Sequence, residues 1–310
     1  FQIEFDLLSG QFSHAHFEAG RTSDVVTGDQ LSQRVQEETL ILRDLGYLNL
    51  NELNELNQQE ARYFISRLKR NAIVYRKNPA PRYHKNGTIQ KKTEYIRYEI
   101  GEIAETVKEG ESQAFEEIYV GTEKMKIRLI IYHFTKEERE KRLQKVTNGA
   151  RGKRHDCSER TKQMTAYNFY ITNLPNEVET AAIHDLYSLR WQIELLFKSW
   201  KSTIDLAQCK PMKIERLYCY FYSQLIQMML CTMVTYQMRY FLWEKSQKEL
   251  SEMKGFKLVF DRLKGIYEAI LKGTDAVVQE LLLLYEQLEV NGLKSRKRGK
   301  PTFQQLIGTL

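Results

Sequence analysis

The residues whose types and spacing most clearly indicate a chemical role lie between positions 187 and 201. At about 100° per residue, one helix through this segment would gather a phenol, a carboxylate and three cations on one face. A carboxylate is a hard oxygen ligand for Mg²⁺ or Mn²⁺, and Arg and Lys side chains bind phosphates. The pattern indicates metal-dependent chemistry on phosphates, but a solvated face with an ordinary ion pair fits the spacing equally well. The residues are Tyr187, Arg190, Glu194, Lys198 and Lys201.

The opposite face of this predicted helix is apolar and suits packing against a sheet. Its members are Leu186, Leu189, Ile193, Leu196 and Trp200. Phosphate chemistry of this kind needs more than one carboxylate. Elsewhere in the chain, Asp44 follows the compact apolar run TLILR at 39–43, which is typical of a buried strand that delivers a carboxylate at its C-terminal end.

The spacing Y-x2-R-x3-E-x6-K, formed by Tyr187, Arg190, Glu194 and Lys201, resembles the Y-R-E-K signature of a group of bacterial insertion-sequence transposases. The segment RDLGY at 43–47 is similar to the block around the second catalytic aspartate of that family. A β-rich stretch separates the two motifs, as in the family. The resemblance covers most of residues 1–212.

This resemblance implies a DDE transposase, an enzyme that cleaves DNA at the ends of a mobile element and joins them to target DNA. Two aspartates and a glutamate would hold two divalent ions, Mg²⁺ or Mn²⁺, with Asp44 as the second aspartate and Glu194 as the glutamate. Tyr187, Arg190, Lys198 and Lys201 would bind DNA. The expected partners are double-stranded DNA and a second subunit, in the cytoplasm of a bacterium.

The first aspartate of the family is not found in this chain. Asp6 is the nearest substitute, but it ends a strand that resembles the second strand of the family core, and Asp24 and Asp29 fall in a loop further along the chain. We therefore expect a chain that is shortened at its N-terminus and incomplete as a catalyst. Two alternatives stay open: a ribonuclease-H-like nuclease or resolvase that cuts without joining, and a catalytically dead, transposase-derived DNA-binding protein.

The expected fold is α/β, with a ribonuclease-H-like mixed sheet interrupted by a β-rich insertion and followed by a mostly helical C-terminal region. Residues 1–70 would form the first part of the core without its first strand, and residues 71–164 the insertion. Residues 165–212 would complete the core and carry the glutamate helix, and residues 213–310 would form the helical region.

The amino-acid composition excludes only a few classes of function. A net charge of +7 fits a polyanionic partner but also suits many other enzymes. The four cysteines show no metal-binding or disulfide spacing, and the apolar surroundings of Cys219 and Cys231 favour buried free thiols in a reducing, intracellular compartment. Residues 217–238 carry no formal charge, yet polar side chains interrupt them so often that a buried core helix is favoured over a membrane span.

Two further groups of cations could contact phosphates. Residues 67–77 hold a possible phosphate track, and a solvated sheet edge is the equal alternative. The tract at 294–300 could add non-specific DNA affinity or be a solvated loop. The track consists of Arg67, Lys69, Arg70, Arg76 and Lys77.

Overall fold

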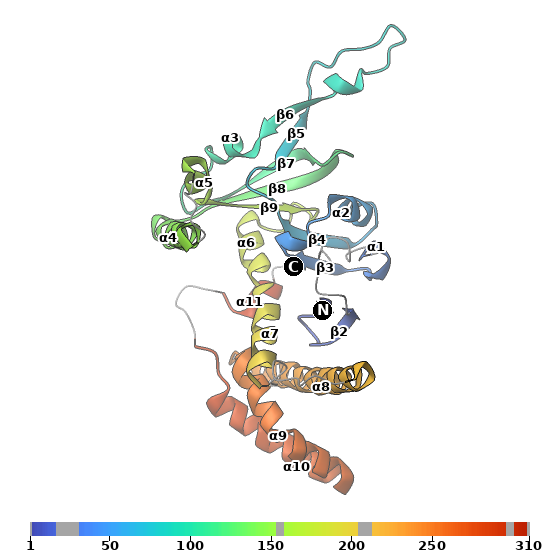
Figure 1. Cartoon of the computed structure of the whole chain (residues 1–310), viewed down its shortest axis with the longest axis vertical. Helices are drawn as coiled ribbons and strands as arrows, with labels where there is room; N and C mark the ends of the chain where they lie inside the picture. Colours follow the sequence, from blue (N-terminus) through green and yellow to red (C-terminus); the bar gives the residue numbers. More distant parts are fainter. Residues whose placement is uncertain (1, 17–30, 153–157, 204–212, 296–300, 309–310) are drawn as a thin grey trace. The chain divides into compact units, whose positions relative to one another are not determined.

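A computed structural model describes residues 2–16, 31–152, 158–203, 213–295 and 301–308 of the chain (Figure 1). The chain divides into two compact units. Unit 1 comprises Phe1–Gly20 and Trp191–Gln305, and unit 2 comprises Arg21–Arg190 and Leu306–Leu310. The border between Arg190 and Trp191 therefore runs through the signature segment.

Unit 2 is built on a seven-stranded mixed sheet in the order β3-β4-β9-β8-β7-β5-β6. Strands β3 and β4 are parallel, and all other neighbours are antiparallel. The strands that were expected to form an insertion continue this same sheet. The bounds are β3 Thr39–Arg43, β4 Arg62–Arg67, β5 Ile73–Lys77, β6 Tyr95–Glu99, β7 Ser112–Val120, β8 Met125–His133 and β9 Tyr167–Thr172.

Central strands of the sheet are rich in β-branched and aromatic residues, which suit a pleated surface that is covered on both faces. In β8, Leu129, Ile130 and Ile131 are all fully buried, as is Phe169 on the neighbouring strand β9. The core also takes in apolar side chains from helix α2 (Leu50–Asn57). A rigid sheet thus supports the strand ends where the candidate site lies.

Strand β3 lies at the end of the sheet. It pairs with β4, and no other strand in the described ranges pairs with its second edge. Its apolar residues Leu40, Ile41 and Leu42 are only partly buried. Parallel strands are normally buried within a sheet, so this edge is unusually apolar for an end position.

The helices of unit 2 are short, apart from α4. Their bounds, with those of the 3₁₀ turns η1 and η2, are α1 Leu31–Arg34, η1 Leu45–Tyr47, η2 Lys91–Thr93, α3 Ile100–Ala104, α4 Lys136–Gly152, α5 Glu159–Met164 and α6 Thr180–Ser188. The highly charged segment 136–146 lies within α4. Helix α4 begins after Thr135, whose hydroxyl and backbone N–H both lie close to the Glu138 carboxylate.

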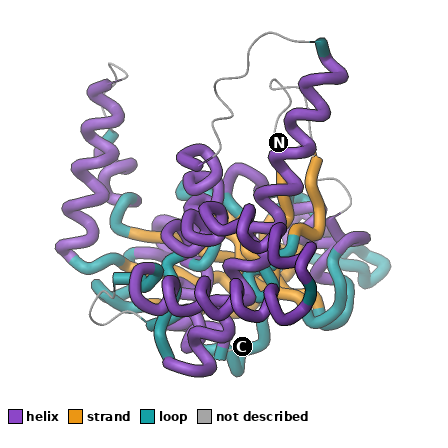
Figure 2. Tube along the Cα trace, turned by 90° about the horizontal axis from the view of Figure 1, so that it is seen from below, coloured by secondary structure: helices purple, strands orange, loops and turns teal. Residues whose placement is uncertain are grey.

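Unit 1 combines a hairpin with long helices, which are purple in Figure 2. The hairpin strands β1 (Gln2–Phe5) and β2 (Phe12–His16) are antiparallel. The helices are α7 Trp191–Thr203, α8 Ile214–Ser246, α9 Glu252–Lys272, α10 Thr274–Asn291 and α11 Phe303–Ile307, whose last residues belong to unit 2. Phe5, Phe12 and Trp200 join the apolar core of this unit.

The expected core helix at 217–238 is the central part of α8, but only one of its faces is buried. Met228 and Cys231 lie in the core, whereas Ile226 and Leu230 are 58% and 51% exposed. The buried hydroxyl of Thr232 donates to the carbonyl oxygen of Met228, so burial leaves it satisfied. No helix in the described ranges is long and apolar enough to cross a membrane.

The prediction of one continuous helix from Tyr187 to Lys201 is wrong. Helix α6 ends at Ser188 and α7 begins at Trp191. Between them, the N–H groups of Leu189 and Arg190 donate to the carbonyl oxygens three residues earlier, those of Leu186 and Tyr187. This tighter hydrogen bonding ends the α-helical register, so the four signature residues do not share one helical face.

Candidate active site

Asp44 is the first residue after β3. It precedes the 3₁₀ turn η1, and the Tyr47 N–H donates to its main-chain oxygen at 3.0 Å. Its side chain makes no capping hydrogen bond to the turn and is 44% exposed. The backbone thus closes the turn by itself, which leaves the carboxylate available for other contacts.

Tyr187 approaches this carboxylate from the last turn of α6. Its hydroxyl donates a long hydrogen bond to Asp44 Oδ1 at 3.5 Å, and its buried ring packs on Tyr170 with centroids 5.1 Å apart. Burial raises the pKa of Tyr187 to about 12; the Asp44 charge adds to this increase and the Arg190 charge opposes it. The phenol is therefore a neutral hydrogen-bond donor near pH 7.

Arg190, in the turn after α6, is the third member of this group. Its Nε lies 3.6 Å from Asp44 Oδ1, and the guanidinium is 5.8 Å from the centre of the Tyr187 ring. The side chain is 18% exposed, so the ion pair is partly shielded from water. The fold thus brings together two motifs that are 143 residues apart between Asp44 and Tyr187.

Glu194, Lys198 and Lys201 belong to α7 in unit 1. Spacings of four and seven residues place them along one side of this helix. Glu194 is partly buried, whereas both lysines are exposed and make no ion pair with a described residue. The predicted site residues therefore fall into two groups, one in each unit.

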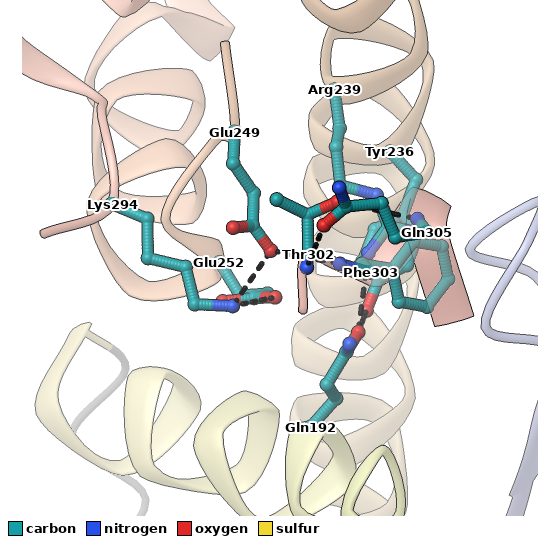
Figure 3. A network of polar contacts seen from close by, with 9 residues as sticks. All are labelled: Gln192, Tyr236, Arg239, Glu249, Glu252, Lys294, Thr302, Phe303 and Gln305. Atoms are coloured by element: carbon teal, nitrogen blue, oxygen red, sulfur yellow. Dashed lines mark hydrogen bonds and ion pairs between the residues drawn. The ribbon is translucent and has the colours of Figure 1, made fainter. Parts of the chain in front are cut away.

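A buried polar network anchors α7 within unit 1 (Figure 3). Gln192 Oε1 accepts hydrogen bonds from Arg239 at 3.1 Å and from the Tyr236 hydroxyl at 3.4 Å. The Arg239 guanidinium lies against the rings of Tyr236 and Phe303, and it also donates to the carbonyl oxygen of Leu7. This network fixes the first turn of the helix that carries Glu194.

Two further residues have structural roles. Arg43 is buried and forms an ion pair with Glu52 on α2 at 2.5 Å. Asp6 closes the hairpin turn, because its carboxylate accepts hydrogen bonds from the Leu8 N–H and the Ser9 hydroxyl. The basic tract lies mostly outside the described residues, and its first member, Lys294, pairs with Glu249.

The carboxylate oxygens of the described residues are of the type that binds a divalent cation, but too few of them lie together to complete a site. Asp44 Oδ2 accepts no hydrogen bond from the described part of the chain, so a hard oxygen ligand is available there. Within the described ranges, however, no group of three or more His, Cys, Asp or Glu side chains is placed to hold a metal ion. The described residues alone do not complete a three-carboxylate site.

Comparison with known proteins identifies the family. The family model described as "Transposase DDE domain" matches residues 1–230. The chain is 37% identical to the transposase for insertion sequence element IS231F of Bacillus thuringiensis subsp. israelensis and 38% identical to that for IS231C of subsp. berliner, over 100% of its own length and 65% of theirs. It is 34% identical to the transposase for IS1151 of Clostridium perfringens, over 97% of its length and 64% of that protein.

No solved structure matches the chain significantly. The mixed α/β architecture agrees with the expected ribonuclease-H-like class, and family membership implies the use of a divalent metal. The chain spans about 65% of the length of the IS231 relatives. It belongs to the DDE transposase family.

Proposed function

We propose that the full-length protein is a DNA transposase that cleaves the ends of an insertion sequence and joins them to target DNA. The observation that carries the proposal is the contact of Asp44 with Tyr187 and Arg190. The two motifs resemble the family separately, and the fold brings residues of both into one polar site. The relatives are named as transposases of insertion sequences, which supports the same activity.

In this proposal Asp44 and Glu194 are catalytic metal ligands. Two Mg²⁺ or Mn²⁺ ions, when bound, activate water or a 3′-hydroxyl and stabilise the leaving oxygen. The third carboxylate is proposed to come from the part of the relatives' length that this chain does not span. Arg190 and Tyr187 hold Asp44 in position and, together with Lys198 and Lys201, contact phosphates of double-stranded DNA. The protein is proposed to act as a homodimer in the bacterial cytoplasm.

The test is metal-dependent cleavage of element-end DNA by the full-length protein and by two isosteric variants, Asp44→Asn and Glu194→Gln. Each variant keeps its shape but loses a ligand charge, and we expect a loss of activity of at least a thousandfold with unchanged DNA binding. Glu244→Gln, an exposed position on α8, is the matched control and should keep full activity. Normal cleavage by Asp44→Asn or Glu194→Gln would refute the assignment.

The products separate the competing functions. Joined products that contain both element-end and target DNA support transposition, whereas cleavage without joining supports a nuclease or resolvase. A third function, that of a DNA-binding protein without catalysis, also agrees with the incomplete carboxylate set of the described residues. A full-length protein that binds DNA but no Mn²⁺ in calorimetry would support that function and contradict our proposal.

A further inference from the structure

A cluster of cations in unit 2 is not accounted for by the site around Asp44. Arg67, at the end of β4, and Arg142, on α4, donate to the same acceptor, Asn168 Oδ1 on β9, at 2.8 and 3.3 Å. Their two Nη2 atoms are therefore at most about 6 Å apart, close enough for appreciable repulsion. Arg70 lies at the same end of β4 and donates to Thr165 Oγ1 at 3.1 Å.

No carboxylate in the described part of the chain forms an ion pair with Arg67 or Arg142. The Nε atoms of both are buried and without a hydrogen-bond acceptor among the described residues. The acidic group that acts on Arg142 is Glu138, one turn earlier on α4, and its carboxylate is engaged with Thr135 and with the Tyr132 hydroxyl. Burial, together with repulsion by Arg67 and Arg70, lowers the pKa of Arg142 to about 10.

The shared acceptor is held in place by further hydrogen bonds. Asn168 Nδ2 donates to the Tyr170 hydroxyl at 2.8 Å, and that hydroxyl lies 2.6 Å from His184 Nδ1. The His184 ring stacks on Tyr132, with centroids 4.1 Å apart. The Arg142 guanidinium also lies over the Phe134 ring at 4.1 Å. Two guanidinium groups are thus fixed beside each other although they repel, which is a net cost unless an anion joins them.

The cluster adjoins the candidate active site. The Tyr170 ring packs on the Tyr187 ring, whose hydroxyl reaches Asp44, and the charge of Arg67 acts on both phenols. A chain of contacts runs from Asn168 through Tyr170 and Tyr187 to Asp44, so an anion held at the two arginines is a different one from a group at Asp44. Guanidinium groups bind phosphate through their N–H donors, and the Nη1 atoms of both arginines make no hydrogen bond to the described residues.

We propose that Arg67 and Arg142 form a binding site for a non-scissile phosphate of the DNA backbone. The proposal rests on the proposed function, because it takes DNA as the partner. The site holds the duplex at a fixed distance from Asp44 and gives α4 a role in DNA binding. Asn168 is a positioning residue that sets the two guanidinium groups in the geometry that a phosphate needs.

The test uses the full-length protein, its Arg142→Gln variant and a matched control, Lys141→Gln. Lys141 is the adjacent residue on α4, is 69% exposed and pairs with Glu137, so the control removes the same charge from the same helix. We expect Arg142→Gln to weaken DNA binding roughly tenfold or more and to reduce the salt slope of log K by about 1. Lys141→Gln should leave both nearly unchanged.

A scan of DNA duplexes with one uncharged methylphosphonate each identifies the phosphate. The wild-type protein should bind more weakly when the methylphosphonate replaces one particular phosphate away from the cleaved bond. Arg142→Gln should bind that duplex as well as it binds the unmodified duplex. If Arg142→Gln behaves like Lys141→Gln in affinity, slope and scan, the site is wrong, while cleavage that depends on Asp44 would leave the proposed function intact. If Arg142→Gln in addition melts at a lower temperature than the wild-type protein, the two arginines instead bind an acidic group of the protein itself.

If Arg142→Gln does not fold, Arg142→Lys takes its place, because it keeps the charge but loses the planar pair of donors. Its affinity should fall severalfold while its salt slope stays close to that of the wild-type protein. Wild-type affinity in this variant would overturn the proposal.

Discussion

Tyr187 couples the candidate site to the stability of unit 2. Its pKa is raised by burial to about 12, so the folded protein favours the neutral phenol. The resulting stabilisation is complete below pH 10, where the phenol is neutral in both the folded and unfolded states. It is lost as the pH rises from 10 through 12, because the unfolded chain ionises first.

We therefore expect Tyr187→Phe to flatten the alkaline part of the stability profile. Relative to the wild-type protein, the variant should lose about 2 kcal/mol less of its free energy of unfolding between pH 9 and pH 12. Urea unfolding monitored by circular dichroism at several pH values measures the difference. Parallel profiles for the two proteins would show that the hydroxyl ionises freely in the folded state.

Some of the residues in the candidate sites could be identified from the sequence, and others could not. Asp44, Tyr187 and Arg190 come from two short motifs that the family resemblance singles out, although it does not predict the contact of Asp44 with Tyr187 and Arg190. The cations at 67–77 were equally compatible with a phosphate track and with a solvated edge. Arg142 and Asn168 could not be singled out, because nothing in a highly charged helix distinguishes a cation held over Phe134 from one in water.

The junction between α6 and α7 shows a limit of periodicity at the scale of elements. The apolar positions 186, 189, 193, 196 and 200 continue a helical pattern through the break, and all of these side chains are buried or partly buried. Two 3₁₀ hydrogen bonds at Leu189 and Arg190 interrupt the helix without disturbing that pattern. Apolar spacing predicts which side chains are buried, but it does not predict where the backbone changes its hydrogen bonding.

The hairpin turn offers a sharp test of packing in unit 1. Gly10 has a φ of +74°, and a Cβ atom there would lie 2.6 Å from the Cβ and Cγ of Tyr236. Gly87 has a similar φ of +81° and no atom within 4 Å of its hypothetical Cβ. Gly87→Ala should therefore cost about 1 kcal/mol from backbone strain alone, and Gly10→Ala at least 2 kcal/mol more. Chemical denaturation compares them, and equal losses would contradict the close packing of the turn on α8.

The two faces of α8 should respond differently to polar substitution. Ile226→Gln and Leu230→Gln lie on the exposed face and should each change the free energy of unfolding by less than about 1 kcal/mol. Met228→Gln places an unsatisfied amide in the core and should cost about 3 kcal/mol. Thermal and urea unfolding measure all three. A large loss at Ile226 would mean that the apolar face is covered in solution.

On the scale of the whole molecule, the sequence predicts the fold class and most elements well. The strand before Asp44 and the helices of the C-terminal region lie at their expected positions. The joining of strands 73–133 to the core sheet could not be predicted, because pairing between strands that are distant in sequence leaves no local pattern. The predicted domain boundaries stay a prediction.

The open edge of β3 has a practical consequence for work with this chain. Its N–H and C=O groups can accept another strand, so the chain on its own is expected to add strands from neighbouring copies and to aggregate. The same edge makes the protein suitable for strand complementation: a separately supplied peptide that pairs with β3 would cap the edge and keep the mixture soluble. Light scattering of the chain with and without such a peptide would detect this rescue.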